Sequence, residues 1–66
     1  MKFKELDVVK VLIDFPEEKI KKDETGTVVL THSVPTEAYE VEFVNDDGST
    51  KAVFAILPSD IEKVLC

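Results

Sequence analysis

Residues 39–48 read Tyr39-Glu40-Val41-Glu42-Phe43-Val44-Asn45-Asp46-Asp47-Gly48. Apolar and charged side chains alternate over the first five positions, which is the period of a β-strand with one buried and one solvated face. The last four positions hold residue types that tolerate the left-handed conformations of a tight reversal. A second apolar run, residues 52–57, follows closely. The stretch therefore predicts an antiparallel hairpin and an all-β domain.

Two further segments rich in β-branched residues precede the hairpin. Residues 6–13 predict a first strand and residues 26–31 a second, which begins at Gly26. At that glycine we expect either a positive φ or a close approach of another part of the backbone. The hairpin itself adds strands at residues 38–44 and 50–57, so four strands are predicted before the C-terminal segment.

A long and highly charged loop, residues 14–25, joins the first two strands. Pro16 cannot donate a backbone hydrogen bond to a sheet, which places this segment outside the ladders. Phe15 and Ile20 are expected to fold inward and anchor the loop. Residues 16–19 could form one helical turn with the proline near its start.

Pro58-Ser59-Asp60 interrupts the fourth strand and predicts a 3₁₀ turn. Residues 61–65 then predict a short fifth strand; a short helix is the alternative, since Ser59 and Asp60 are both capping residues. Five strands with a long first loop and a 3₁₀ turn before the last strand resemble a small SH3-like barrel. An open sheet of three or four strands closed by a terminal helix is the second candidate.

Length and composition restrict what this chain can be. Sixty-six residues make one domain with a thin core. Domains of this size commonly need a disulfide, a metal or a partner subunit. Cys66 is the only cysteine and His32 the only histidine, which excludes an internal disulfide and a cysteine-rich metal site. Association with another chain is the remaining source of extra stabilisation.

The chain carries 8 basic and 14 acidic residues and a net charge of −6. Such a surface repels phosphate backbones and anionic lipids, so neither nucleic acid nor a membrane is expected as a partner. No segment approaches the roughly 20 apolar residues of a membrane span, and the first residues lack the pattern of a signal peptide. We therefore expect a cytoplasmic protein, and the unpaired Cys66 fits a reducing compartment.

Patterns that carry catalysis or bind metals are weak throughout the chain. Glu40 and Glu42 are neighbours on one strand face but are expected to be solvated, and His32 is expected to be a surface residue. Asp46 and Asp47 lack the spacing of a calcium loop and belong to the hairpin turn. We expect no catalytic residue, metal or cofactor, and a small enzyme is the least favoured class.

Tyr39 and Cys66 each allow a functional and a structural interpretation. Tyr39 shares its strand face with Val41 and Phe43 and is expected in the core, so an aromatic groove for proline-rich peptides is not predicted. Cys66 is the last residue and is expected to be a free thiol rather than the site of an intermolecular disulfide.

Apolar residues are predicted on both faces of the first and fourth strands, and one small core cannot enclose both sets. On the first strand, the inward-facing set is Val9, Val11 and Ile13. The residues expected to stay on the surface, free or covered by another chain, are Val8, Leu12, Val29, Val53 and Ala55. We expect them to form the self-complementary interface of a homo-oligomer. The alternative is that they are ordinary scattered surface residues.

Four carboxylates in and beside the hairpin suggest a different partner. Glu40, Glu42, Asp46 and Asp47 lie close together in the sequence of an acidic chain. An acidic surface can steer and bind a basic protein, as an adaptor or an antitoxin-like protein does. The sequence thus predicts a non-enzymatic interaction module, either self-associating or bound to a basic partner.

Several segments resemble known families. Residues 57–64 resemble the end of an SH3 domain, and residues 7–11 with 26–29 resemble the opening strands of KOW-type and CAP-Gly-type barrels. Taken whole, the chain resembles a family of small bacterial proteins known only as a domain of unknown function. The matching segments of that family are Glu-Leu-Asp-Val-Val at residues 5–9, Gly-Thr-Val-Val at residues 26–29 and Ala-Tyr-Glu-Val-Glu-Phe-Val at residues 38–44.

This resemblance implies an SH3-like barrel and no particular activity, because fold alone carries no function. Members near mobile gene cassettes or toxin–antitoxin-like genes suggest an accessory role. The chain departs from the family at one turn: the pattern has a glycine in the segment before Gly26, where this chain has Asp23-Glu24-Thr25. We expect the loop geometry to differ there.

Overall fold

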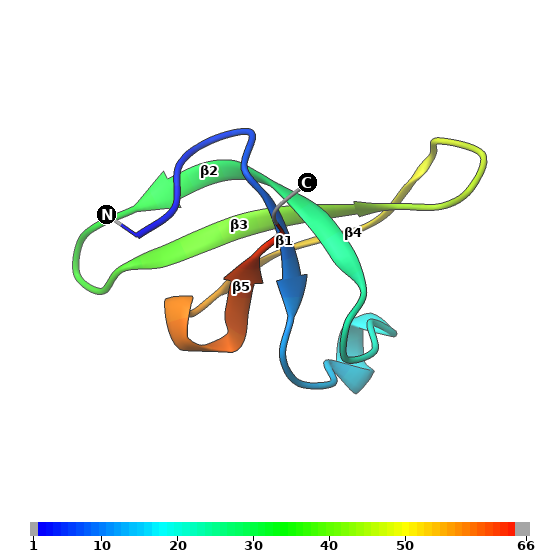
Figure 1. The fold of residues 1–66 in the computed structure, drawn as a ribbon, viewed down its shortest axis with the longest axis horizontal. Helices are drawn as coiled ribbons and strands as arrows, with labels where there is room; N and C mark the ends of the chain where they lie inside the picture. Colours follow the sequence, from blue (N-terminus) through cyan, green and yellow to red (C-terminus); the bar gives the residue numbers. More distant parts are fainter. Residues whose placement is uncertain (1, 65–66) are drawn as a thin grey trace.

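Over residues 2–64, which the computed structural model describes, five strands form one antiparallel sheet (Figure 1). The strands are β1 (Val8–Val11), β2 (Thr25–His32), β3 (Ala38–Val44), β4 (Thr50–Ile56) and β5 (Ile61–Lys63). Their order in the sheet is β4-β3-β2-β1-β5, so β4 and β5 are the edge strands. Two 3₁₀ turns complete the fold, η1 (Pro16–Glu18) and η2 (Pro58–Asp60).

This architecture confirms the all-β prediction, with its long first loop and its 3₁₀ turn before the last strand. The described part of the chain contains no α-helix, so the sheet closed by a terminal helix is not the fold adopted. Leu65, which was expected to end the fifth strand, and Cys66 lie outside the described residues.

The hairpin of β3 and β4 forms as its sequence predicts. Tyr39 pairs with Ile56, and the ladder continues to a bulge between Phe43 and Val44. In the turn, the Gly48 N–H donates to the Asn45 carbonyl at 2.9 Å, and Gly48 has a φ of 89° that favours glycine. Figure 1 shows the tip of this hairpin, in yellow, projecting beyond the rest of the sheet.

The core covers a single face of the sheet. Among residues 2–64, ten apolar side chains are buried: Phe3, Val9, Val11, Ile20, Val28, Tyr39, Val41, Phe43, Ile56 and Ile61. Most of them alternate along the strands with half-buried or exposed neighbours, as the period of two requires. Phe3 and Ile20 are added from the segments before and after β1. Among residues 2–64, no buried apolar side chain lies on the opposite face of the sheet.

The first strand is shorter than the sequence predicts, covering four residues instead of residues 6–13. Leu6 has a φ of 75°, a left-handed conformation that cannot continue a strand. After Val11 the chain leaves β2 and the Leu12 N–H donates to the Asp60 carbonyl at 2.8 Å. Ile13 was expected in the core with Val9 but is 46% exposed, because it lies beyond the end of the strand.

Gly26 allows β2 to lie directly against β3. It is buried, and a Cβ built on it would lie 2.7 Å from the Glu42 carbonyl oxygen and 2.7 Å from a methyl group of Val41. Close approach, not positive φ, is therefore the reason for a glycine here. The left-handed residue of this turn is Asp23, with a φ of 76°, in the segment where the resembling family has a glycine.

The first loop folds back on itself as a small hairpin. Phe15 and Ile20 exchange backbone hydrogen bonds of 2.7 and 3.1 Å around the turn η1. Ile20 is buried. The ring centroids of Phe15 and of Phe54 on β4 are 5.1 Å apart. The prediction that these two residues anchor the loop, and that it contains one helical turn, is confirmed.

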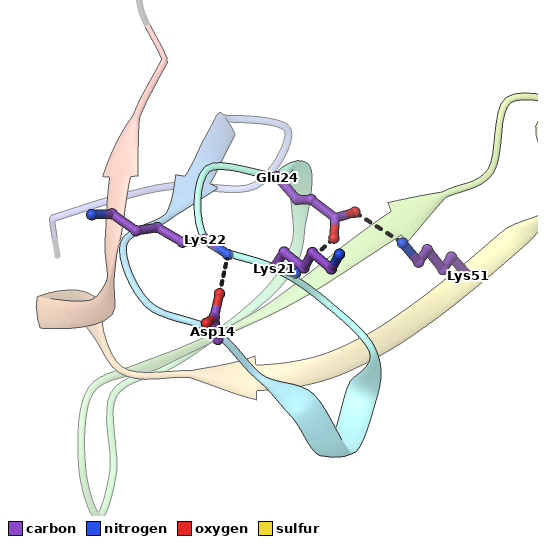
Figure 2. A network of polar contacts seen from close by, with 5 residues as sticks. All are labelled: Asp14, Lys21, Lys22, Glu24 and Lys51. Atoms are coloured by element: carbon purple, nitrogen blue, oxygen red, sulfur yellow. Dashed lines mark hydrogen bonds and ion pairs between the residues drawn. The ribbon is translucent and has the colours of Figure 1, made fainter.

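Polar contacts hold the second half of this loop (Figure 2). The Lys22 N–H donates to Asp14 Oδ1 at 2.7 Å, and the Lys21 N–H donates to Glu24 Oε2 at 2.7 Å. Lys51 on β4 lies 3.0 Å from the other oxygen of Glu24. The hydrogen bond from Lys21, followed by that from Lys51, lowers the pKa of the Glu24 carboxyl. The loop is thereby joined to a strand distant in sequence.

Tyr39 holds the N-terminal segment against the sheet. Its ring is buried and packs edge-on against Phe3, with ring centroids 5.2 Å apart. Its hydroxyl accepts hydrogen bonds from the N–H groups of Lys2 and Phe3, at 2.9 and 3.1 Å, and donates to the carboxylate of Glu37. The expectation that Tyr39 belongs to the core is confirmed.

Replacing Gly26 with alanine should destabilise the fold by about 1–3 kcal/mol, because the added methyl group overpacks a closed contact. Urea denaturation monitored by circular dichroism measures the change in the free energy of unfolding. Gly48→Asn is the control, since nothing lies within 4 Å of that position and asparagine tolerates its positive φ. Equal stability of Gly26→Ala and the natural chain would contradict the assigned role of this glycine.

The Tyr39–Glu37 contact should make stability depend on pH. The hydrogen bonds from Tyr39 and from the Lys2 backbone lower the folded-state pKa of Glu37 below its ordinary value of 4.5. The contribution of the Glu37 carboxylate to the free energy of unfolding is therefore present above pH 4.5. It is lost as the pH falls through the depressed folded-state pKa. We expect the stability difference between the natural chain and Glu37→Gln to be largest at neutral pH and to shrink in acid. Urea midpoints at about pH 7 and pH 3 test this, and a constant difference would contradict it.

Candidate protein-interaction surface

The face of the sheet opposite the core, here called the outer face, carries most of the candidate residues. Paired residues of neighbouring strands point to the same side of a sheet. One row of partners runs from β1 to β4 through Val8, Thr27, Glu42 and Val53. A second row runs through Leu30, Glu40 and Ala55. We define the outer face by these seven residues.

Apolar side chains on the outer face are open to solvent. Val8 and Leu30 are each 43% exposed and Val53 is 45% exposed, while Ala55 is also exposed. Val8 and Val53 are separated by two strands, a distance of roughly 14 Å at the usual strand spacing. The candidates on strands one and four therefore share a face but do not form one continuous apolar patch.

The remaining two apolar candidates lie apart from these rows. Val29 is exposed and sits at the irregularity of β2 between Val28 and Leu30. Leu12 is half-buried beyond the end of β1, where it lines a cleft of about 450 Å³ with Phe3. Of the five predicted residues, the structure thus groups Val8, Val53 and Ala55 on the outer face and leaves Val29 and Leu12 outside both rows.

The four predicted carboxylates divide into two pairs. Glu40 and Glu42 stand on β3 in the middle of the outer face, and both are half-buried. Asp46 and Asp47 lie in the turn at the tip of the hairpin. Hydrogen bonds from the hydroxyl and the N–H of Ser49, at 2.6 and 2.9 Å, lower the pKa of Asp47.

Each outer-face carboxylate has one polar neighbour. His32 Nε2 lies 2.8 Å from Glu40 Oε2, and the two side chains form an ion pair when the imidazole is protonated. The Thr50 hydroxyl donates to Glu42 Oε2 at 2.8 Å. One oxygen of each carboxylate is therefore engaged within the chain, which holds both groups in place on the face.

Sequence reasoning missed Leu30 as a surface residue. In an unbroken strand Leu30 would share a face with the buried Val28, two residues earlier. The bulge between them inserts one extra residue, so Leu30 becomes the partner of Glu40 and turns outward. No feature of the local sequence marks this irregularity, because bulges depend on the pairing of two strands.

The described residues offer little for other kinds of site. Within residues 2–64, no group of three or more His, Cys, Asp or Glu side chains is placed to hold a metal ion. The same residues include no helix that is both long and apolar enough to cross a membrane. What the arrangement offers is a ridge of two carboxylates, on Glu40 and Glu42, between exposed apolar side chains.

Comparison with known proteins gives a family and no activity. The model of the family described as a domain of unknown function (DUF4926) matches residues 5–63. No curated protein and no solved structure matches the chain. Because the match covers nearly the whole of residues 1–66, this chain belongs to the DUF4926 family of domains of unknown function.

Proposed function

We propose that this chain is a non-enzymatic protein-interaction module that binds a basic partner through the outer face of its sheet. The observation that carries the proposal is the position of Glu40 and Glu42 among the exposed side chains of Leu30, Val53 and Ala55. Fixed carboxylates flanked by exposed apolar side chains suit a partner segment that carries both positive charge and apolar groups.

The distribution of charge supports a basic partner. Three lysines of the described chain lie within 4 Å of carboxylates other than those of the outer face: Lys10 with Glu62, Lys51 with Glu24 and Lys63 with Asp7. Across residues 2–64, none of the ion pairs joins a lysine to Glu40 or Glu42. With a net charge of −6, the chain also attracts basic proteins from a distance.

Self-association is the second candidate function. Val53 and Ala55 are exposed on β4, which is an edge strand, so a second copy could approach along this side. Packing two outer faces together about a two-fold axis would instead bring Glu40 and Glu42 of both copies together, and like charges in an interface oppose binding. The carboxylates therefore favour a basic partner over a face-to-face dimer.

We further propose that the sheet curves into an SH3-like barrel. The position of β1 between β2 and β5, and the turn η2 directly before β5, support this assignment. The proposed setting is the bacterial cytoplasm, with an accessory role, on the strength of the family resemblance and of a single unpaired cysteine.

Light scattering coupled to size exclusion, with a reducing agent present, separates the two candidate functions. We expect a mass of 7.4 kDa for the free chain, unchanged in Val53→Asp, because that side chain lies on the outer face and is 45% exposed. A mass at an integer multiple that Val53→Asp reduces would instead establish self-association through β4.

Titration of the labelled chain with hexalysine, followed by NMR, tests the proposed surface. We expect the largest shifts at the amides of Glu40, Glu42 and Val53, and a loss of binding above about 0.15 M salt as charges are screened. The variant Glu40→Gln/Glu42→Gln should bind more weakly than Asp46→Asn/Asp47→Asn, which changes the net charge equally. The reverse order of these two variants would place the binding surface at the hairpin tip.

A further inference from the structure

We infer that the partner segment received by the outer face is a basic amphipathic α-helix lying along β3. This inference rests on the proposed function and names the kind of partner it requires. Three features of the face carry it: the spacing of the two carboxylates, the position of the apolar side chains on either side of them, and the pairing of the β3 backbone with a strand on each side.

The two carboxylates match the repeat of a helix. Glu40 and Glu42 are two residues apart on one strand, which separates them by about 6.8 Å along β3. Residues four apart on an α-helix follow one another by about 6 Å along the axis and point to the same side. A pair of lysines or arginines at i and i+4 can therefore reach both carboxylates at once.

The apolar side chains lie where the flanks of such a helix would rest. Leu30 stands beside Glu40 on β2, and Ala55 stands beside it on β4, with Val53 next to Glu42 on the same strand. β2 and β4 are two strand spacings apart, or about 10 Å, which is close to the diameter of a helix with its side chains. Apolar residues on both sides of the basic pair would cover these exposed groups.

A helix also suits the surface better than the other occupants. In the middle of the sheet, the backbone groups of β3 pair with β2 and β4, so an extended segment laid across the face would leave its own N–H and C=O groups unpaired. A helix satisfies its backbone internally. A second copy of the outer face would present Glu40 and Glu42 to their own counterparts.

His32 and Thr50 each occupy one oxygen of an outer-face carboxylate. His32 Nε2 lies 2.8 Å from Glu40 Oε2, and the Thr50 hydroxyl donates to Glu42 Oε2 at 2.8 Å. The second oxygen of each carboxylate is the one a partner lysine would meet. Binding is measured at about 0.05 M salt, where screening of these charges is weak.

The test is isothermal titration calorimetry of the chain with two designed peptides. The first has about 18 residues, five helical turns, with lysine pairs at i and i+4 flanked by leucine. The second has the same composition except for two central prolines, which break the helix. We expect saturable binding of the first peptide and binding at least about tenfold weaker for the second. Glu40→Gln/Glu42→Gln should weaken the first by roughly tenfold, as expected for two part-exposed charge contacts, and Asp46→Asn/Asp47→Asn by less than about twofold.

Each contrary result has a distinct meaning. Equal binding of both peptides overturns the inference that the partner is a helix and leaves the proposed function in place. Failure of the helical peptide to bind has the same meaning if hexalysine still shifts the NMR signals of the outer face. Binding that Glu40→Gln/Glu42→Gln does not weaken overturns both the helix and the proposed surface. Saturable binding that follows the expected order of peptides and variants supports both.

Discussion

The structure depends on one constraint: a single sheet with one small core can cover only one of its two faces. Ten buried apolar side chains fill the inner face, and each strand residue between them must turn outward. Burial of each large apolar side chain contributes about 1.5–3 kcal/mol to the stability of the fold, which favours an apolar residue at every inward position. The same alternation leaves Val8, Val53 and Ala55 on the outer face. The surface proposed for interaction is thus a direct consequence of how the core is built.

The N-terminal segment and the first loop serve that core rather than the outer face. Phe3 is held by the hydroxyl and ring of Tyr39, and Ile20 is brought inward by a small hairpin that also places Phe15 against Phe54. Gly26 lets β2 approach β3 closely. The outer face is left with exposed apolar groups beside two carboxylates that are held by hydrogen bonds. Its two carboxylates are the basis of the proposal that it binds a basic partner segment.

Local sequence predicted most of this architecture. The alternation around Val41, the turn at Gly48 and the 3₁₀ turn at Pro58 all depend on neighbouring residues, and each appears as expected. Predictions were wrong where a segment depends on remote contacts. The first strand stops early because the Leu12 N–H donates to the carbonyl of Asp60, nearly fifty positions later in the chain. The family match carries no activity.

The sequence by itself determined the class of fold, the hairpin and the acidic character of the chain, since strand period, turn chemistry and net charge are properties of adjacent residues or of composition. Only the tertiary structure decided which candidates share a surface. The bulge of β2 turned Leu30 toward Glu40, and the strand register set Glu42 between Thr27 and Val53 while leaving Asp47 at the hairpin tip. Register and bulges arise from pairing between strands distant along the chain, and no local pattern encodes them.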